Sequence, residues 1–181
     1  QRSENGISSS HTELYVQDTS RTETKLGSLT VNYGARLSQW SWNREWLFSP
    51  RVSLGYVPAG NDNLTFRLAT GLYYQRPFYK ELRDTVTTNG NTTVRLNEDI
   101  KSQRSYQILL SMDYKFKLAN RPFKFSTELY YKAQSRLNPY NVDNVKIVYY
   151  GNNCATGYVV GADFKLFGEF VPGTDSWISF G

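Results

Sequence analysis

Few residues in this sequence combine a reactive type with a spacing that supports catalysis. His11 is the single histidine and lies two positions from Glu13, and Cys154 is the single cysteine. These counts exclude an intrachain disulfide, a cysteine-rich zinc site and a metal centre built on several histidines. Glu98 and Asp99 are adjacent carboxylates, which fit a solvated loop better than a cation site. Hydrolase, metal and phosphate-loop motifs are also missing, so we expect no enzyme and no cofactor.

Aromatic and basic residues in two long polar segments are better candidates for ligand binding. Aromatic rings offer faces on which sugars or flat ligands stack, and arginine offers forked donors for carboxylate or phosphate groups. The alternative is that these side chains only pack the loops against each other. The candidates are Arg76, Phe78, Tyr79, Tyr140, Tyr149 and Tyr150.

The elements that must position these loops alternate strictly between apolar and polar residues, which is typical of half-buried β-strands. The clear segments are 29–37, 51–56, 64–73, 107–116, 123–132 and 158–167, and weaker strands are expected at 11–19 and from 175 onward. In each clear segment one face is free of charge. The opposite faces carry Arg36, Arg51, Arg67, Asp113, Lys115, Lys124, Glu128, Lys132, Asp163 and Lys165.

Composition narrows the class of protein. Lys and Arg number 21 against 16 Asp and Glu, but the basic residues form no block, so a nucleic-acid groove is not expected. An aromatic content of 15% argues against disorder. The mean hydropathy is −0.55 and no apolar run approaches the ~18 residues of a transmembrane helix. A transmembrane β-barrel remains compatible, because its strands alternate apolar and polar residues.

The connections between the expected strands differ in length at the two ends of the sheet. Segments 76–102 and 133–157 are long and fall at one end, whereas 19–28, 58–63, 117–121 and 170–174 are short. Transmembrane barrels have short periplasmic turns and long extracellular loops. Aromatic residues near the expected strand ends are typical of girdles at the two membrane interfaces. They are Trp40, Trp42, Trp46 and Phe48 at the long-loop end, and Tyr56, Phe116 and Phe123 at the other.

Several stretches of the chain resemble the barrel of TonB-dependent outer-membrane receptors, most closely those of the Bacteroidetes. They are SPRVSLGYVP (49–58), LTFRLATGLYYQRPFYKELRD (64–84), NEDIKSQRSYQILLSMDYKFK (97–117), NRPFKFSTELYYKA (120–133) and PYNVDNVKIVYYGNNCATGYVVGADFKLFGEFVPG (139–173). The resemblance implies an all-β, antiparallel, up-and-down transmembrane barrel of 22 strands. It also implies TonB-dependent uptake of a scarce nutrient, such as a siderophore, cobalamin, glycan or peptide, across the outer membrane of a Gram-negative bacterium.

The chain is too short for such a receptor, because about eight strands cannot close so wide a barrel. We interpret residues 1–181 as part of the barrel domain of a longer chain, without its plug domain and TonB box. The expected partners are outer-membrane lipid, the N-terminal plug domain of the parent chain and, through the parent, the TonB complex. A surface lipoprotein is a further candidate partner. The residues expected to face the lumen or plug are Arg36, Arg51, Arg67, Lys124, Glu128, Asp163 and Lys165.

Two alternatives make different structural predictions. A complete eight-stranded outer-membrane barrel with a structural or adhesion role would pair Leu14 and Val16 with the last strand. A soluble β-barrel that binds an apolar ligand would turn its uncharged face inward. The receptor interpretation instead predicts an open sheet whose uncharged face is exposed to lipid. On that face, Leu68, Leu110, Leu129 and Phe164 are expected near the middle of the membrane, with Ala69 and Ser111 facing inward.

Overall fold

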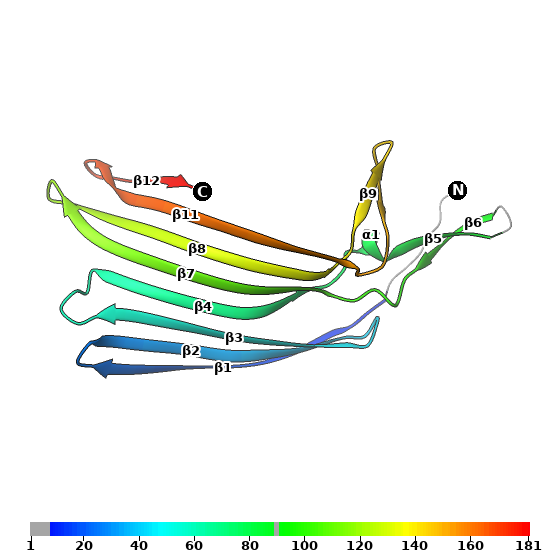
Figure 1. The fold of residues 1–181 in the computed structure, drawn as a ribbon, viewed down its shortest axis with the longest axis horizontal. Helices are drawn as coiled ribbons and strands as arrows, with labels where there is room; N and C mark the ends of the chain where they lie inside the picture. Colours follow the sequence, from blue (N-terminus) through cyan, green and yellow to red (C-terminus); the bar gives the residue numbers. More distant parts are fainter. Residues whose placement is uncertain (1–7, 89–90) are drawn as a thin grey trace.

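The computed structural model describes residues 8–88 and 91–181. Its main element is one eight-stranded sheet in which the strands follow one another in chain order (Figure 1). All neighbours in this sheet are antiparallel, as predicted. The strands are β1 (His11–Thr24), β2 (Gly27–Trp40), β3 (Glu45–Pro58), β4 (Leu64–Gln75), β7 (Gln103–Leu118), β8 (Arg121–Leu137), β11 (Ala155–Val171) and β12 (Thr174–Phe180).

The register places the uncharged faces of the six clear segments on one side of the sheet. Leu54 pairs with Leu68, Leu68 with Leu110, and Leu110 with Leu129. Phe164 lies two residues beyond the partner of Leu129 and is therefore on the same face. One continuous apolar surface thus extends across the sheet, and the charges predicted to face inward lie on the other side.

The apolar surface is open rather than covered by a second layer. Ile108 and Leu110 of β7 are 37% and 48% exposed, whereas their neighbours Gln107 and Leu109 on the opposite face are partly buried. A soluble sandwich or barrel would bury this face to form its core. Within the described residues, the buried hydrophobic side chains are only Trp40, Leu47, Leu82, Ile100 and Phe123. The uncharged face therefore needs an apolar solvent, which argues against the soluble alternative.

Tight turns connect the strands at one end of the sheet, on the left of Figure 1. Ala119 and Asn120 have φ values of 50° and 62°, as in the type I′ turns that suit a right-twisted hairpin. Pro172 and Gly173 form the turn between β11 and β12, and Gly173 has a φ of 75°, which a type II turn requires at its third position. Short connections at this end agree with the predicted periplasmic turns.

The two long loops carry structure of their own at the opposite end. The first contains α1 (Tyr79–Leu82) and the hairpin of β5 (Arg83–Thr88) and β6 (Asn91–Leu96), and the second contains the hairpin of β9 (Tyr140–Asp143) and β10 (Lys146–Tyr149). In Figure 1 both hairpins project beyond the ends of the long strands. The only helix in the described part of the chain is α1, and none there is long and apolar enough to cross a bilayer.

The prediction that Trp40 belongs to an aromatic girdle, which rested on its residue type and its position near a strand end, is wrong. Trp40 is 6% exposed and packs with Leu82 and Ile100 in a small core, against which Trp42 and Leu96 are packed. Its position in β2 gives it the same face as Arg36 and Ser38, so its ring points inward, where the first long loop covers it. Trp46 and Phe48 fit the girdle prediction better, since both lie on the apolar face and are exposed.

The sheet is not closed. Leu14 and Val16 of β1 pair with Leu37 and Ala35 of β2, and β1 and β12 are the two edges of the sheet. A complete eight-stranded barrel requires pairing between these two strands. The described residues therefore contradict the small closed barrel and agree with an open part of a wider one.

Candidate functional site

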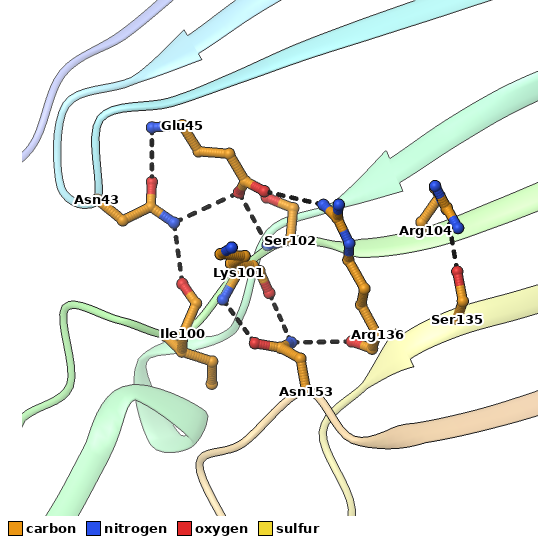
Figure 2. Close-up of polar contacts among 9 residues, drawn as sticks. All are labelled: Asn43, Glu45, Ile100, Lys101, Ser102, Arg104, Ser135, Arg136 and Asn153. Atoms are coloured by element: carbon orange, nitrogen blue, oxygen red, sulfur yellow. Dashed lines mark hydrogen bonds and ion pairs between the residues drawn. The ribbon is translucent and has the colours of Figure 1, made fainter.

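Glu45, the first residue of β3, joins the end of the first long loop to the end of β8 (Figure 2). Its carboxylate accepts hydrogen bonds from the Asn43 side chain at 3.3 Å and from the backbone N–H of Ser102 at 2.9 Å. It also forms an ion pair with Arg136 at 3.5 Å. The Glu45 side chain is only 12% exposed, so these partners replace most of its contacts with water.

Asn153 fastens the second long loop to the first. Its side-chain oxygen accepts a hydrogen bond from the backbone N–H of Lys101 at 2.7 Å. Its side-chain nitrogen donates to the backbone carbonyls of Lys101 and Arg136, both at 2.8 Å (Figure 2). Because one amide satisfies three backbone groups from two segments, it holds the loops in a defined relative position.

A hollow of about 530 Å³ lies between these loops and the ends of β4, β7, β8 and β11. We call it the loop hollow. Phe78 from the first long loop lines it together with Tyr140 and Tyr149 from the second. Tyr140 and Tyr149 are cross-strand partners in the β9–β10 hairpin, with ring centroids 5.9 Å apart and planes tilted by 57°. The remaining lining residues are Gln75, Glu81, Gln103, Leu137, Asn138, Pro139 and Ala155.

Two polar side chains of the loop hollow are almost fully buried. Glu81 is 5% exposed, and its carboxylate accepts hydrogen bonds from the Phe78 backbone N–H at 2.7 Å and from the Gln103 side-chain amide at 3.2 Å. Asn138 is 7% exposed, and its oxygen accepts a hydrogen bond from the Gly151 N–H at 3.0 Å. The Asn138 side-chain nitrogen has no hydrogen-bond partner among the described residues.

The structure brings together half of the loop residues singled out in the sequence. Phe78, Tyr140 and Tyr149 line the loop hollow. Arg76 precedes it and is exposed, and Tyr150 is 59% exposed just beyond β10. Tyr79 opens α1 and is 43% exposed. These three residues lie close to the loop hollow along the chain without lining it.

Sequence reasoning missed the polar part of the loop hollow. Glu81, Gln103 and Asn138 are ordinary surface residue types, and no spacing connects them. Their shared site depends on the fold of the two loops. The one usable signal in the sequence is the position of Gln103, which directly follows the long segment 76–102 that holds Arg76, Phe78 and Tyr79.

The charged face of the sheet contains its own set of ion pairs. Asp113 of β7 accepts a hydrogen bond from Arg67 at 2.7 Å and one from Ser126 at 2.6 Å, and it pairs with Lys124 at 3.2 Å. Arg36 pairs with Glu13 of β1 at 3.4 Å. Arg51 lies over the ring of Tyr73, 4.4 Å from its centroid. The predicted inward residues therefore share one polar wall.

Two like-charge pairs lie directly opposite each other on this wall. Glu128 of β8 is the cross-strand partner of Asp163 in β11, and Lys115 of β7 is the partner of Lys124 in β8. Like charges in direct opposition destabilise a sheet. The charge of Lys124 is neutralised by its ion pair with Asp113. Glu128 and Asp163 have no ion pair with any described residue. Lys165 lies near aromatic rings, with its ammonium 4.5 Å from the centroid of Phe167.

Comparison with protein families matches residues 1–177 to the TonB dependent receptor-like, beta-barrel family. The chain belongs to this family. Members are outer-membrane transport receptors, so the family places the exposed apolar face of the sheet in lipid and the long loops on the extracellular side. It is a family of transporters rather than of enzymes, and it works in general with a plug domain and TonB. Searches among curated proteins and among solved structures gave no match.

Proposed function

We propose that residues 1–181 form part of the barrel wall and the ligand-receiving loops of a receptor for a scarce nutrient. The nutrient classes considered are siderophores, cobalamin, glycans and peptides. The loop hollow carries this proposal, because it combines exposed aromatic rings with buried polar groups between two ordered loops. Concave sites of this composition are typical of small-ligand binding. Arg76, Phe78, Tyr79, Tyr140, Tyr149 and Tyr150 are the proposed ligand contacts.

The polar wall is the proposed contact surface for the plug domain of the parent chain. Arg36, Arg51, Arg67, Lys124, Glu128, Asp163 and Lys165 are the residues assigned to it. The opposed carboxylates of Glu128 and Asp163 support this assignment, because a partner with basic groups would neutralise them. Energy for uptake comes from the TonB complex acting on the parent chain, and a surface lipoprotein would help to capture the nutrient.

The transport function is tested by deleting the parent gene in its own bacterium. We expect the deletion strain to lose growth on one limiting nutrient among iron–siderophore, cobalamin, a glycan and a peptide mixture. The wild-type gene should restore growth when TonB is present and fail to restore it when TonB is depleted. Uptake that is equal with and without the gene for all four nutrients would contradict the proposal, as would restoration that is independent of TonB.

A further inference from the structure

We infer that the loop hollow is a binding subsite for a neutral, hydroxyl-rich ring, that is, for a sugar unit of a glycan. The inference rests on the transport function proposed above and assigns the substrate class of the same site. It depends on three properties of the loop hollow, which are its exposed aromatic rings, its unpartnered buried donor and the signs of the charges around it.

The aromatic rings of the loop hollow are exposed although they are large. Phe78 is 63% exposed and Tyr140 is 60% exposed, and they come from different loops. Rings left in water cost free energy, and their flat apolar faces suit the C–H faces of sugar rings. The volume of about 530 Å³ falls in the usual range for small-ligand sites of roughly 300–1,000 Å³.

Asn138 supplies a donor that the protein itself does not use. The hydrogen bond from Gly151 N–H to the Asn138 oxygen fixes the orientation of the amide, so its nitrogen is the group left without a partner. A buried donor without a partner is costly, and a hydroxyl oxygen of a ligand would satisfy it. Asn138 lines the loop hollow, where such a hydroxyl would be placed.

Charge favours a neutral ligand over an anionic one. Glu81 is the only charged side chain among the lining residues, and no lysine or arginine lines the loop hollow. A carboxylate or phosphate ligand would therefore find no cation in the lining of the loop hollow and would be repelled there by Glu81. The Glu81 carboxylate instead orients the Gln103 amide, which keeps a second N–H and a carbonyl for hydroxyl groups.

The subsite is tested on the intact receptor, purified in detergent, with labelled tetrasaccharides as probes. The panel contains neutral glucan, xylan, mannan and fructan tetrasaccharides, with ferric citrate and tetraalanine as the two other arms. We expect at least one neutral tetrasaccharide to bind. Phe78→Ala, Tyr140→Ala and Asn138→Asp should each weaken its binding at least tenfold. Asn138→Asp keeps the acceptor for Gly151 N–H while removing the unused donor, and thermal melting of each variant is measured beside its binding to separate lost folding from lost contacts.

Val145→Ala is the matched control, because Val145 lies in the same β9–β10 hairpin, is 92% exposed and does not line the loop hollow. Its effect on binding should stay within twofold. Failure of every neutral tetrasaccharide to bind would overturn the inference, as would sugar binding that the three variants leave unchanged. TonB-dependent uptake of ferric citrate or tetraalanine without sugar binding would overturn the sugar subsite while leaving the transport function intact. Sugar binding without TonB-dependent uptake would support the subsite and contradict the transport function.

Discussion

The ring of Phe123 in β8 covers Gly168, its cross-strand partner in β11. A methyl group at Gly168 would collide with the near edge of that ring. The ring cannot move away freely, because it stacks on Phe116 at 5.7 Å and meets Phe170 edge-on at 5.4 Å. Aromatic residues opposite glycines occur where sheets bend, and here the glycine makes room for a compact aromatic cluster near the periplasmic turns.

Gly168→Ala is therefore expected to destabilise the barrel by about 1–3 kcal/mol, the usual cost of overpacking. Gly55→Ala is the matched control, because its new methyl group would meet Thr30 at an ordinary 3.8 Å. Unfolding titrations of the intact receptor in lipid vesicles measure the free energy of unfolding of both variants. If the collision is the cause, the penalty should shrink in a Phe123→Leu background. Equal penalties for Gly168→Ala and Gly55→Ala would contradict this explanation.

Leu110→Arg should cost about 2–4 kcal/mol, because Leu110 is on the lipid face near the middle of its strand. The next residue, Ser111, faces the lumen, so Ser111→Arg should cost much less. The same vesicle titrations compare the two variants, which differ by one position and by the face they occupy. Similar penalties would show that the assignment of the two faces is wrong.

Glu45→Ala should loosen the extracellular loops without unfolding the sheet. It leaves the Ser102 N–H and the Arg136 guanidinium without their carboxylate, at an expected cost of about 1–3 kcal/mol. Hydrogen exchange should become faster in segments 97–102 and 136–153, with little change in β2 and β3. The control is Glu23→Ala, which removes an exposed ion pair with Arg21 and should have little effect. Faster exchange in the strands of the sheet would contradict a local role for Glu45.

Asp113→Asn should lower the stability of the lumen wall, because Asp113 pairs with both Arg67 and Lys124. Without the carboxylate, these cations and the neighbouring Lys115 repel one another. Salt screens such repulsion, so the deficit of the variant should shrink as sodium chloride is raised from low to high concentration. Thermal melting of the intact receptor at several salt concentrations tests this. A deficit that does not change with salt would indicate lost hydrogen bonds rather than repulsion.

The strands and their faces could be predicted from the sequence, because a period of two is set by the backbone of each strand alone. The same period assigns Trp40 correctly, since counting in twos from Arg36 places it on the charged face. The girdle prediction failed for Trp40 because it relied on residue type and on nearness to a strand end. Trp40 is buried by the first long loop, which the strand pattern does not describe.

The loop hollow could be predicted only in part, for a physical reason. Its aromatic residues stand out by type, but its polar residues meet through contacts between distant segments. Gln103 and Glu81 are 22 positions apart, and Asn153 and Lys101 are 52 positions apart. Such contacts depend on the conformations of whole loops, which carry no simple periodicity.

The eight strands of the main sheet lie side by side in the order in which they occur along the chain, so each strand pairs only with the one before it and the one after it. The contact order of the sheet is therefore low for a β-protein, and the entropy lost when each new strand joins is limited to one loop closure. Assembly can proceed by adding one hairpin at a time to a growing edge. The same property makes the hairpin a natural unit of duplication or loss, so a wall of this kind can change its circumference over evolution without a new core.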